Sequence, residues 1–84
     1  MSGAMDVGIG HRLKHARAQR EVTQVDLAHQ TGVGLRTIRQ IEQTDFEPRL
    51  ATARKLASAL SVRVEWLVFG IEPMIKAKGE EVPR

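Results

Sequence analysis

The chain has 84 residues, of which 42% are apolar and 27% are charged, and its formal net charge at pH 7 is +3. This length allows one small domain, and the absence of cysteine excludes both a disulfide framework and a thiolate metal site. Cationic residues outnumber acidic ones most strongly in residues 11–39, which predicts a basic face and favours a polyanionic partner. The cationic residues in this range are Arg12, Lys14, Arg17, Arg20, Arg36 and Arg39.

The first predicted helix covers residues 9–20. Residues 1–6 contain a second methionine and small side chains, so we expect them to be disordered or the remnant of a tag and to lie outside the fold. The junction after residue 20 has no glycine for a left-handed C-terminal residue, which predicts a strained or different helix end there. One face of the predicted helix carries Ile9, Leu13, Ala16 and Arg20.

Residues 23–42 predict two short helices joined by a tight turn. Thr23 can cap the start of the first helix, and Gly32 can end it without a Cβ penalty. In the second helix Ile38 and Ile41 face inward together with Val33. Arg and Gln match the paired donors and acceptors of base edges in the major groove, so the outer face suits the reading of DNA. The outward positions are Leu35, Arg36, Arg39, Gln40 and Gln43.

Two further helices complete the prediction of an all-α fold with five helices and no strand. Residues 43–47 form a linker, and Pro48 can begin a helix that runs to about Leu60. Residues 64–69 form a final short helix that Gly70 ends. We expect the folded domain to span residues 7–71 and residues 72–84 to form a flexible tail.

Several motifs follow one another along the chain, namely RLKHAR, TQVDLA, TIRQIE, LATARKLASALSV and EWLVFG. With these motifs at this spacing, residues 9–70 resemble the helix-turn-helix domains of phage repressors and Cro proteins, also called the xenobiotic-response-element type. The resemblance implies a five-helix lambda-repressor-like domain that binds double-stranded DNA. Our first hypothesis is therefore a sequence-specific transcriptional repressor that binds a palindromic operator as a homodimer and is nucleoid-associated.

The resemblance also assigns the residues that hold the domain on the DNA backbone. Gln24 is expected to bind a phosphate at the first turn of its helix, and Thr23 and Gln43 are expected to assist it. Arg17 and Glu42 are expected to form a structural ion pair between the first helix and the end of the third. The alternative is that these are two unrelated surface charges.

Base edges are expected to meet the start of the third helix. Arg36 suits guanine, Gln40 suits adenine, and Leu35 suits a thymine methyl group. Arg39 suits either a base or a phosphate. The alternative for all of these positions is a solvated helix face.

The chain departs from the family pattern at several positions. The loop after the third helix carries Asp45 and Glu47 where relatives often present a basic residue, and the DNA backbone would repel both carboxylates. Glu21 and Thr44 stand where the family usually has glycine. Gly34 and Arg49 stand where it usually has a residue that caps a helix.

The last predicted helix has more apolar residues than one buried stripe requires. Trp66 and Leu67 are expected to close the core, and the surplus predicts a self-association surface. The candidate dimer interface is Trp66, Val68, Phe69 and Ile71. Two alternatives stay open: the tail covers these residues, or they bind a partner protein, as in an antitoxin that holds its toxin.

Catalysis, cofactors and metals are not expected. His11 and His15 have the one-turn spacing of a helical ligand pair, but no third ligand is evident, and no serine has a neighbouring histidine and acid. No glycine-rich phosphate loop is present. The longest apolar stretch, residues 62–71, is far shorter than the ~20 residues of a membrane helix, so we expect a cytoplasmic protein without a membrane segment.

Overall fold

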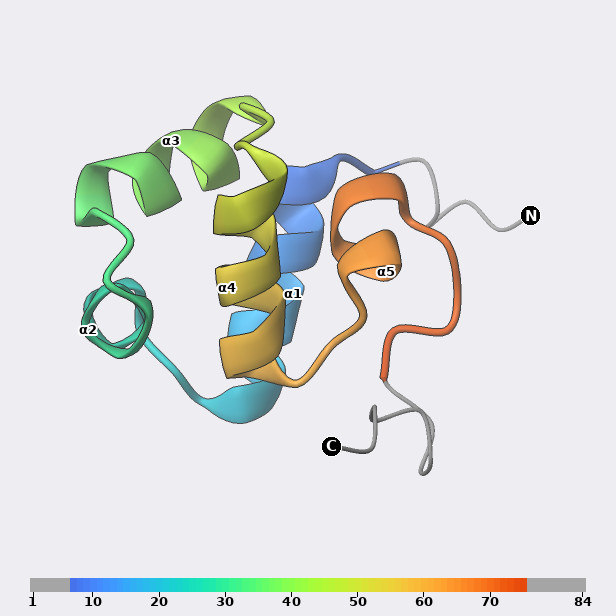
Figure 1. Ribbon diagram of the computed structural model, residues 1–84, viewed down its shortest axis with the longest axis horizontal. Coiled ribbons are helices and arrows are strands. Elements are labelled where there is room, and N and C mark those ends of the chain that lie inside the picture. The colour runs from blue at the N-terminus through green and yellow to red at the C-terminus, as the bar shows by residue number, and fades with distance from the viewer. Residues whose placement is uncertain (1–6, 76–84) are drawn as a thin grey trace.

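The computed structural model describes residues 7–75, and within this range the chain folds into five α-helices (Figure 1). They are α1 (Ile9–Arg20), α2 (Gln24–Thr31), α3 (Leu35–Thr44), α4 (Leu50–Leu60) and α5 (Val64–Phe69). The described part of the chain contains no strand, so the prediction of an all-α five-helix fold is confirmed. The expected N-terminal remnant, residues 1–6, and residues 76–84 of the expected tail lie outside the described residues.

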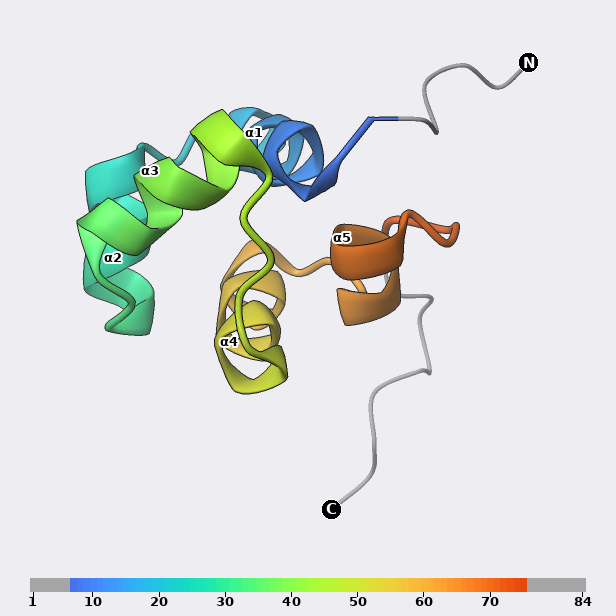
Figure 2. The same cartoon turned by 90° about the horizontal axis from the view of Figure 1, so that it is seen from above.

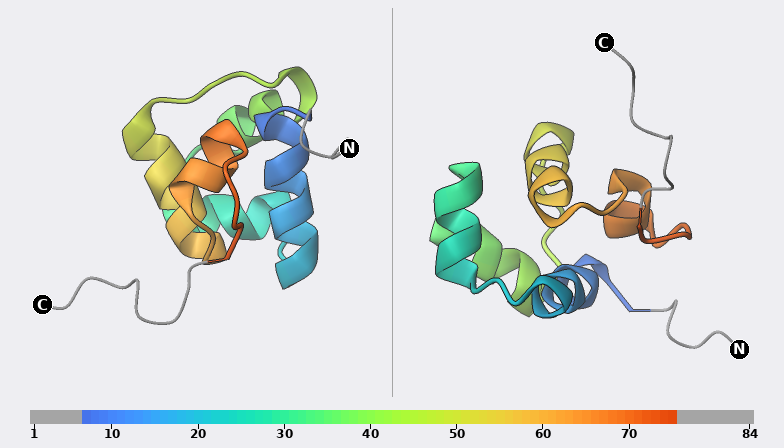
Figure 3. Two further views of the ribbon diagram at one scale, coloured as in Figure 1. Left: turned by 90° about the vertical axis from the view of Figure 1, so that its right-hand side faces the viewer. Right: turned by 90° about the horizontal axis from the view of Figure 1, so that it is seen from below.

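Helix α1 contacts α3, α4 and α5, whereas α2 contacts α3 and α4. Figure 1 shows α3 along the top of the molecule, and in the view from above it lies uppermost, with α2 beneath it (Figure 2). Helix α5 lies on the side of the domain away from α2 and packs against α1 and α4 (Figure 3). One side of α3 is therefore held by α1 and α2, and the other faces away from the domain.

A single hydrophobic core joins all five helices. Each helix contributes at least one large apolar side chain to it, and full burial of such a side chain stabilises a fold by about 1.5–3 kcal/mol. The largest completely buried side chains are those of Leu13, Leu27, Ile38, Ile41, Leu56, Leu60, Leu67 and Val62.

The ends of α2 match the prediction. The Thr23 hydroxyl accepts a hydrogen bond from the N–H of Asp26 at 2.9 Å, and the Asp26 carboxylate accepts one from the N–H of Thr23 at 3.3 Å. This reciprocal capping box satisfies two backbone donors that the helix leaves unpaired. Gly32 ends α2 with a φ of 79°, a left-handed conformation that glycine adopts without a Cβ clash.

Three helices end on left-handed residues that are not glycine, at Glu21, Asp45 and Ser61, whose φ angles are 57°, 60° and 58°. The unusual end predicted after residue 20 is thus present at Glu21, whose N–H bonds the carbonyl of Ala18 at 3.1 Å. Thr44, which stands where the family has a glycine, is still helical, and the left-handed residue is the next one. Each such residue costs roughly 1–2 kcal/mol relative to glycine, so tertiary contacts must hold these turns.

The predicted start of α4 at Pro48 is wrong by two residues. The helix begins at Leu50, because Arg49 has extended backbone angles, with ψ at 154°, and its carbonyl accepts the first helical hydrogen bond from Ala53. Pro48 lies before this N-cap residue and is buried. Its side chain therefore packs the loop onto the domain and does not open the helix.

The chain after α5 turns back toward the start of that helix. The N–H of Arg63 donates to the carbonyl of Met74 at 2.8 Å, and Val62 pairs with Ile75 in an isolated antiparallel bridge. Met74 packs against the core. The first residues of the expected tail, 72–75, are therefore attached to the domain. Within residues 7–75, no helix is both long enough and apolar enough to cross a bilayer.

Candidate nucleic-acid interface

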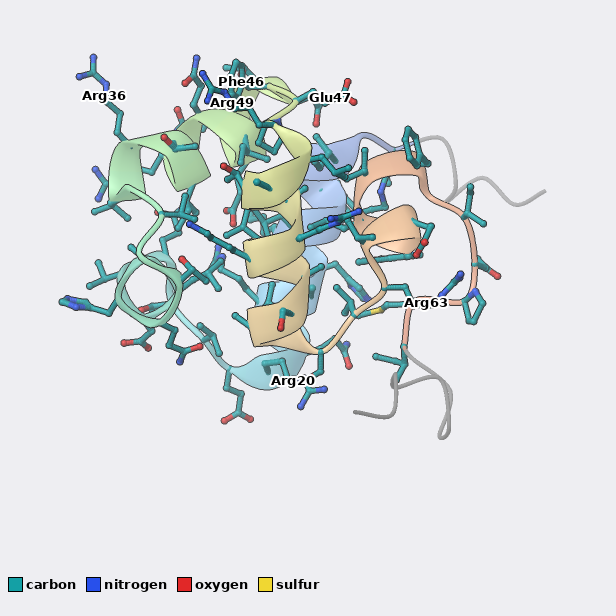
Figure 4. The ribbon with its side chains drawn as sticks, viewed as in Figure 1. Arg20, Arg36, Phe46, Glu47, Arg49 and Arg63 are labelled. Carbon is teal, nitrogen blue, oxygen red and sulfur yellow. The ribbon has the colours of Figure 1, made fainter. Side chains whose placement is uncertain are left out.

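The outer side of α3 carries most of the residues assigned to DNA from the sequence; the others, Thr23 and Gln24, lie at the start of α2. Ile38 and Ile41 lock the inner side, since neither has any exposed surface. Figure 4 shows Arg36 extending into solvent from the N-terminal end of the helix. A shallow, open hollow runs along this side of α3 and is lined by Leu35, Arg36, Arg39, Gln40, Gln43 and Thr44. All of these except the half-buried Leu35 are exposed.

The structure brings the expected partners Arg17 and Glu42 together. Arg17 donates from Nε to Oε2 of Glu42 at 2.6 Å and from its terminal nitrogen to Oε1 at 2.9 Å. This two-bond geometry is the strong form of an arginine–carboxylate pair. The hydrogen bond to Glu42 raises the pKa of Arg17 above its ordinary value, although burial acts in the opposite direction. The pair joins α1 to the C-terminal half of α3.

Gln24, at the first position of α2, takes part in the same network. Its side-chain nitrogen donates to Oε1 of Glu42 at 3.0 Å, and its oxygen accepts from Nε of Arg39 at 3.4 Å. Thr23, the other residue expected to bind phosphate here, accepts the N–H of Asp26 in the capping box and keeps its own hydroxyl proton to donate. Sequence reasoning missed the bond to Arg39, because residues 15 positions apart meet only through tertiary packing.

The acidic loop has a structural explanation. Oδ1 of Asp45 accepts a hydrogen bond from the N–H of Gly10 at 2.9 Å, so the carboxylate caps the start of α1, where Gly8 supplies no side-chain cap. A Cβ atom at Gly10 would lie 2.5 Å from the carbonyl oxygen of Ile41, which shows how closely α1 approaches α3. The Asp45 carboxylate is therefore turned toward α1, and it has a structural role within the domain. Glu47 is exposed near Phe46 and Arg49 (Figure 4).

The expected basic face is only partly formed, because three arginines of α1 bind groups within the domain. Arg12, which is not among the residues of the face predicted for this helix, is only 8% exposed. It donates to the carbonyls of Leu67 and Val68 at 2.9 and 3.0 Å, and also to that of Val7. Burial lowers the pKa of Arg12, and the charge of Asp45 partly opposes this shift.

Arg20 donates from Nε to the carbonyl of Leu60, the last residue of α4, at 3.1 Å. With Arg12 at the end of α5 and Arg17 on Glu42, the arginines of α1 thus serve three other helices. The sequence signal for the roles of Arg12 and Arg20 was weak, since helical periodicity places a residue on a face but does not identify a backbone carbonyl 40 or more positions away. Positive charge facing solvent on α3 comes from Arg36 and Arg39.

The candidate dimer interface divides into a buried and an exposed part. Trp66 is only 6% exposed and belongs to the core, so its indole adds little to any outer surface. Val68 is half-buried, whereas Phe69 and Ile71 are 67% and 53% exposed. Ile75, which the sequence did not single out, is also exposed. The part of the tail that the structure describes leaves these side chains uncovered.

His11 and His15 line a pocket of about 220 Å³ between α1 and the segment after α5, together with Arg12, Trp66 and Met74. The ring centroids of His15 and Trp66 lie 6.4 Å apart. Across residues 7–75, no three acidic, histidine or cysteine side chains come together as a metal site would require.

Comparison with known proteins identifies relatives of this architecture. Residues 13–67 match the protein family described as Helix-turn-helix. The chain is 34% identical over 73 residues to the immunity repressor protein of Bacillus phage phi105, an alignment that covers 87% of this chain and 50% of that protein. It is 40% identical over 55 residues to an uncharacterized HTH-type transcriptional regulator of Methanocaldococcus jannaschii, with 66% of this chain and 83% of that protein covered. The chain thus spans about half the length of the phage repressor.

Proposed function

The chain belongs to the helix-turn-helix family of the phage repressor and Cro type, and from this membership we propose that it is a sequence-specific DNA-binding transcription regulator. The observation that carries the proposal is the outer side of α3, where exposed arginine and glutamine side chains line one open hollow above a completely buried inner side. A helix of this kind fits the major groove, where those side chains match base edges.

Three residues of α3 read bases in this proposal. Arg36 donates two hydrogen bonds to guanine, Gln40 pairs its amide with adenine, and Leu35 contacts a thymine methyl group. The half-buried position of Leu35 at the first residue of α3 suits such a role, because part of its side chain packs against the domain and the remainder faces outward.

Backbone contacts come from the start of α2 and from the C-terminal part of α3. Gln24 has one side-chain N–H left after its bond to Glu42, and the first N–H groups of α2 have no acceptor within the helix. These donors, with the Thr23 hydroxyl, form a site for one phosphate. Gln43 is exposed on α3 and reaches a second phosphate. Such contacts fix the position of the domain and do not select sequence.

The regulator acts as a repressor and binds as a homodimer in this proposal. The name of the phage relative, an immunity repressor, supports the first point. The exposed apolar side chains of Phe69 and Ile71, at the end of α5 and just after it, with Ile75 nearby in sequence, support the second. A two-fold dimer would place its two α3 helices about 34 Å apart, one turn of DNA, on a palindromic operator.

Selection of fragments from genomic DNA with the purified chain at a stated salt concentration tests the function. The expected result is a recurring motif with two inverted half-sites. Fragments that share no motif, bound no better than random DNA, would contradict a sequence-specific regulator. A single, unrepeated half-site would contradict the dimer and leave base reading in place.

The second candidate function is a protein-interaction module, such as an antitoxin that binds its toxin through α5 and the following segment. The exposed apolar side chains of Phe69, Ile71 and Ile75 favour it. A stable complex with a partner protein, formed by a chain that has no affinity for DNA, would decide for this candidate. Loss of partner binding in an Ile71→Ser variant would locate the surface.

A further inference from the structure

Arg39 is attached to α2 through the side chain of Gln24. Nε of Arg39 donates to the Gln24 side-chain oxygen at 3.4 Å, and the Gln24 nitrogen donates to Oε1 of Glu42 at 3.0 Å. Arg36 and Gln40 lie along the same hollow on α3, yet no comparable bond ties either of them to α2. Arg39 therefore occupies the edge of the reading surface that borders the start of α2.

The order of these bonds fixes the orientation of the Gln24 amide. Both oxygens of Glu42 already accept from Arg17, and a carboxylate oxygen cannot donate. Gln24 must therefore turn its NH₂ group toward Glu42, which leaves its oxygen for Arg39. A flipped amide would set two acceptors against each other at Glu42 and two donors against each other at Arg39. Glu42 thus determines which end of Gln24 meets Arg39.

The donors that remain free in this network suit a phosphate. Arg39 uses one N–H on Gln24 and keeps the four of its terminal nitrogens, and Gln24 keeps one N–H after its bond to Glu42. These donors belong to the first residue of α2 and to the arginine bonded to it, and the proposed function places a phosphate at this point. Phosphate oxygens accept several such bonds at once, and the guanidinium adds its charge.

We propose that Arg39 is a phosphate-binding residue and not a base reader, that Gln24 positions its guanidinium, and that Glu42 orients Gln24. Arg39 and Gln24 bind the same phosphate in this arrangement. The proposal rests on the proposed function, because it concerns how the chain binds DNA. It divides α3 into an edge that supplies affinity for any sequence, at Arg39, and a centre that supplies selectivity, at Arg36 and Gln40.

The test compares Arg39→Ala with Arg54→Ala, which removes the same charge from an exposed residue of α4 outside the hollow. Binding is measured from low to high salt on a duplex selected from genomic DNA and on a random duplex of equal length. Arg39→Ala is expected to weaken binding to both duplexes by the same factor and to reduce the slope of log affinity against log salt by about 1. Arg54→Ala should leave the slope nearly unchanged.

Two results would overturn the assignment. The first is that Arg39→Ala changes the ratio of the affinities for the selected and random duplexes as much as Arg36→Ala does. The second is that Arg39→Ala has the same slope of log affinity against log salt as Arg54→Ala. If the parent chain binds neither duplex, the proposed function itself fails. If the parent is selective and only Arg39 behaves as a base reader, the function stands and this inference fails.

The positioning role of Gln24 has its own readout in a double-mutant cycle. Gln24→Ala is expected to lower the affinity of the parent chain more than that of the Arg39→Ala variant, because part of its effect passes through Arg39. Equal effects in the two backgrounds would contradict the positioning role. Thermal unfolding of each variant shows whether a loss of affinity reflects unfolding.

Discussion

Arg17 links α3 to α1 and to the turn before α2 through a single side chain. It forms two bonds with Glu42, and a third to the carbonyl of Val22 at 3.0 Å holds the turn between α1 and α2. Glu42 is nearly buried, so loss of Arg17 would leave its carboxylate without the opposite charge that stabilises it. The orientation of α3 and the stability of the fold thus depend on the same pair.

We expect Arg17→Ala to lower the free energy of unfolding by about 3 kcal/mol, because removal of one partner leaves the other charge buried and uncompensated. Thermal and denaturant unfolding would measure the change. Lys14→Ala, on an exposed position of the same helix, serves as the control and should stay within about 0.5 kcal/mol of the parent. An Arg17→Ala variant with an unchanged melting temperature and DNA affinity would show that the pair does not brace α3.

Residue roles differed in how far the sequence could predict them. The partners Arg17 and Glu42 were expected from the resemblance, since this type of pair accompanies the motif. Arg12 was not, because its acceptors are backbone carbonyls, which any sequence supplies. Trp66 was assigned both to the core and to an interface, and only its actual burial separates these two roles.

At the scale of the elements, the loop between α3 and α4 joins the start of α1 to the end of α3. Asp45 occupies a left-handed position and its carboxylate caps α1. The sequence showed that the loop is acidic, and this suggested a conflict with DNA. It did not show that the Asp45 carboxylate bonds the N–H of Gly10, because that partner is 35 positions away. The presence and order of the helices were predicted better than their ends. Periodicity identifies a buried face, whereas the start of α4 depends on the backbone conformation of Arg49.

Replacement of Asp45 by alanine and by asparagine separates the cap from the charge. Asp45→Ala removes the acceptor and places a residue that disfavours positive φ, so we expect a loss of roughly 2 kcal/mol in the free energy of unfolding. Asp45→Asn retains an acceptor oxygen and tolerates the left-handed conformation, so it should lose less than half of that amount. Denaturant unfolding measures both variants, and equal losses would contradict a capping role.

At the scale of the whole molecule, the fold was predictable because five helical segments, their order and their buried stripes are all encoded locally. The apolar surface left exposed was harder to predict, since exposure of an apolar side chain depends on where the chain runs after α5. The described residues turn back to Val62 and still leave Phe69 and Ile71 open to solvent. Helix α5 and the segment that follows it, which carry these residues, lie on the side of the domain opposite α2 (Figure 1).

A dimer formed through this surface should be sensitive to polar substitution there. We expect Phe69→Ser and Ile71→Ser to shift the chain toward the monomer in sedimentation velocity, at concentrations where the parent is a dimer, because less apolar area is removed from water. Phe46→Ser, which changes an exposed apolar residue next to α3, is the matched control and should not alter the distribution. A parent chain that stays monomeric at every concentration would contradict the dimer.

Base reading by α3 is tested most directly by the affinities of Arg36→Ala and Gln40→Ala for a duplex selected from genomic DNA and for a random duplex. Each substitution is expected to cost about 1–3 kcal/mol on the selected duplex, roughly a 5- to 150-fold loss, with a much smaller change on the random one. Band shifts at one fixed salt concentration give both values. If both variants bind the two duplexes as the parent does, α3 does not read the sequence.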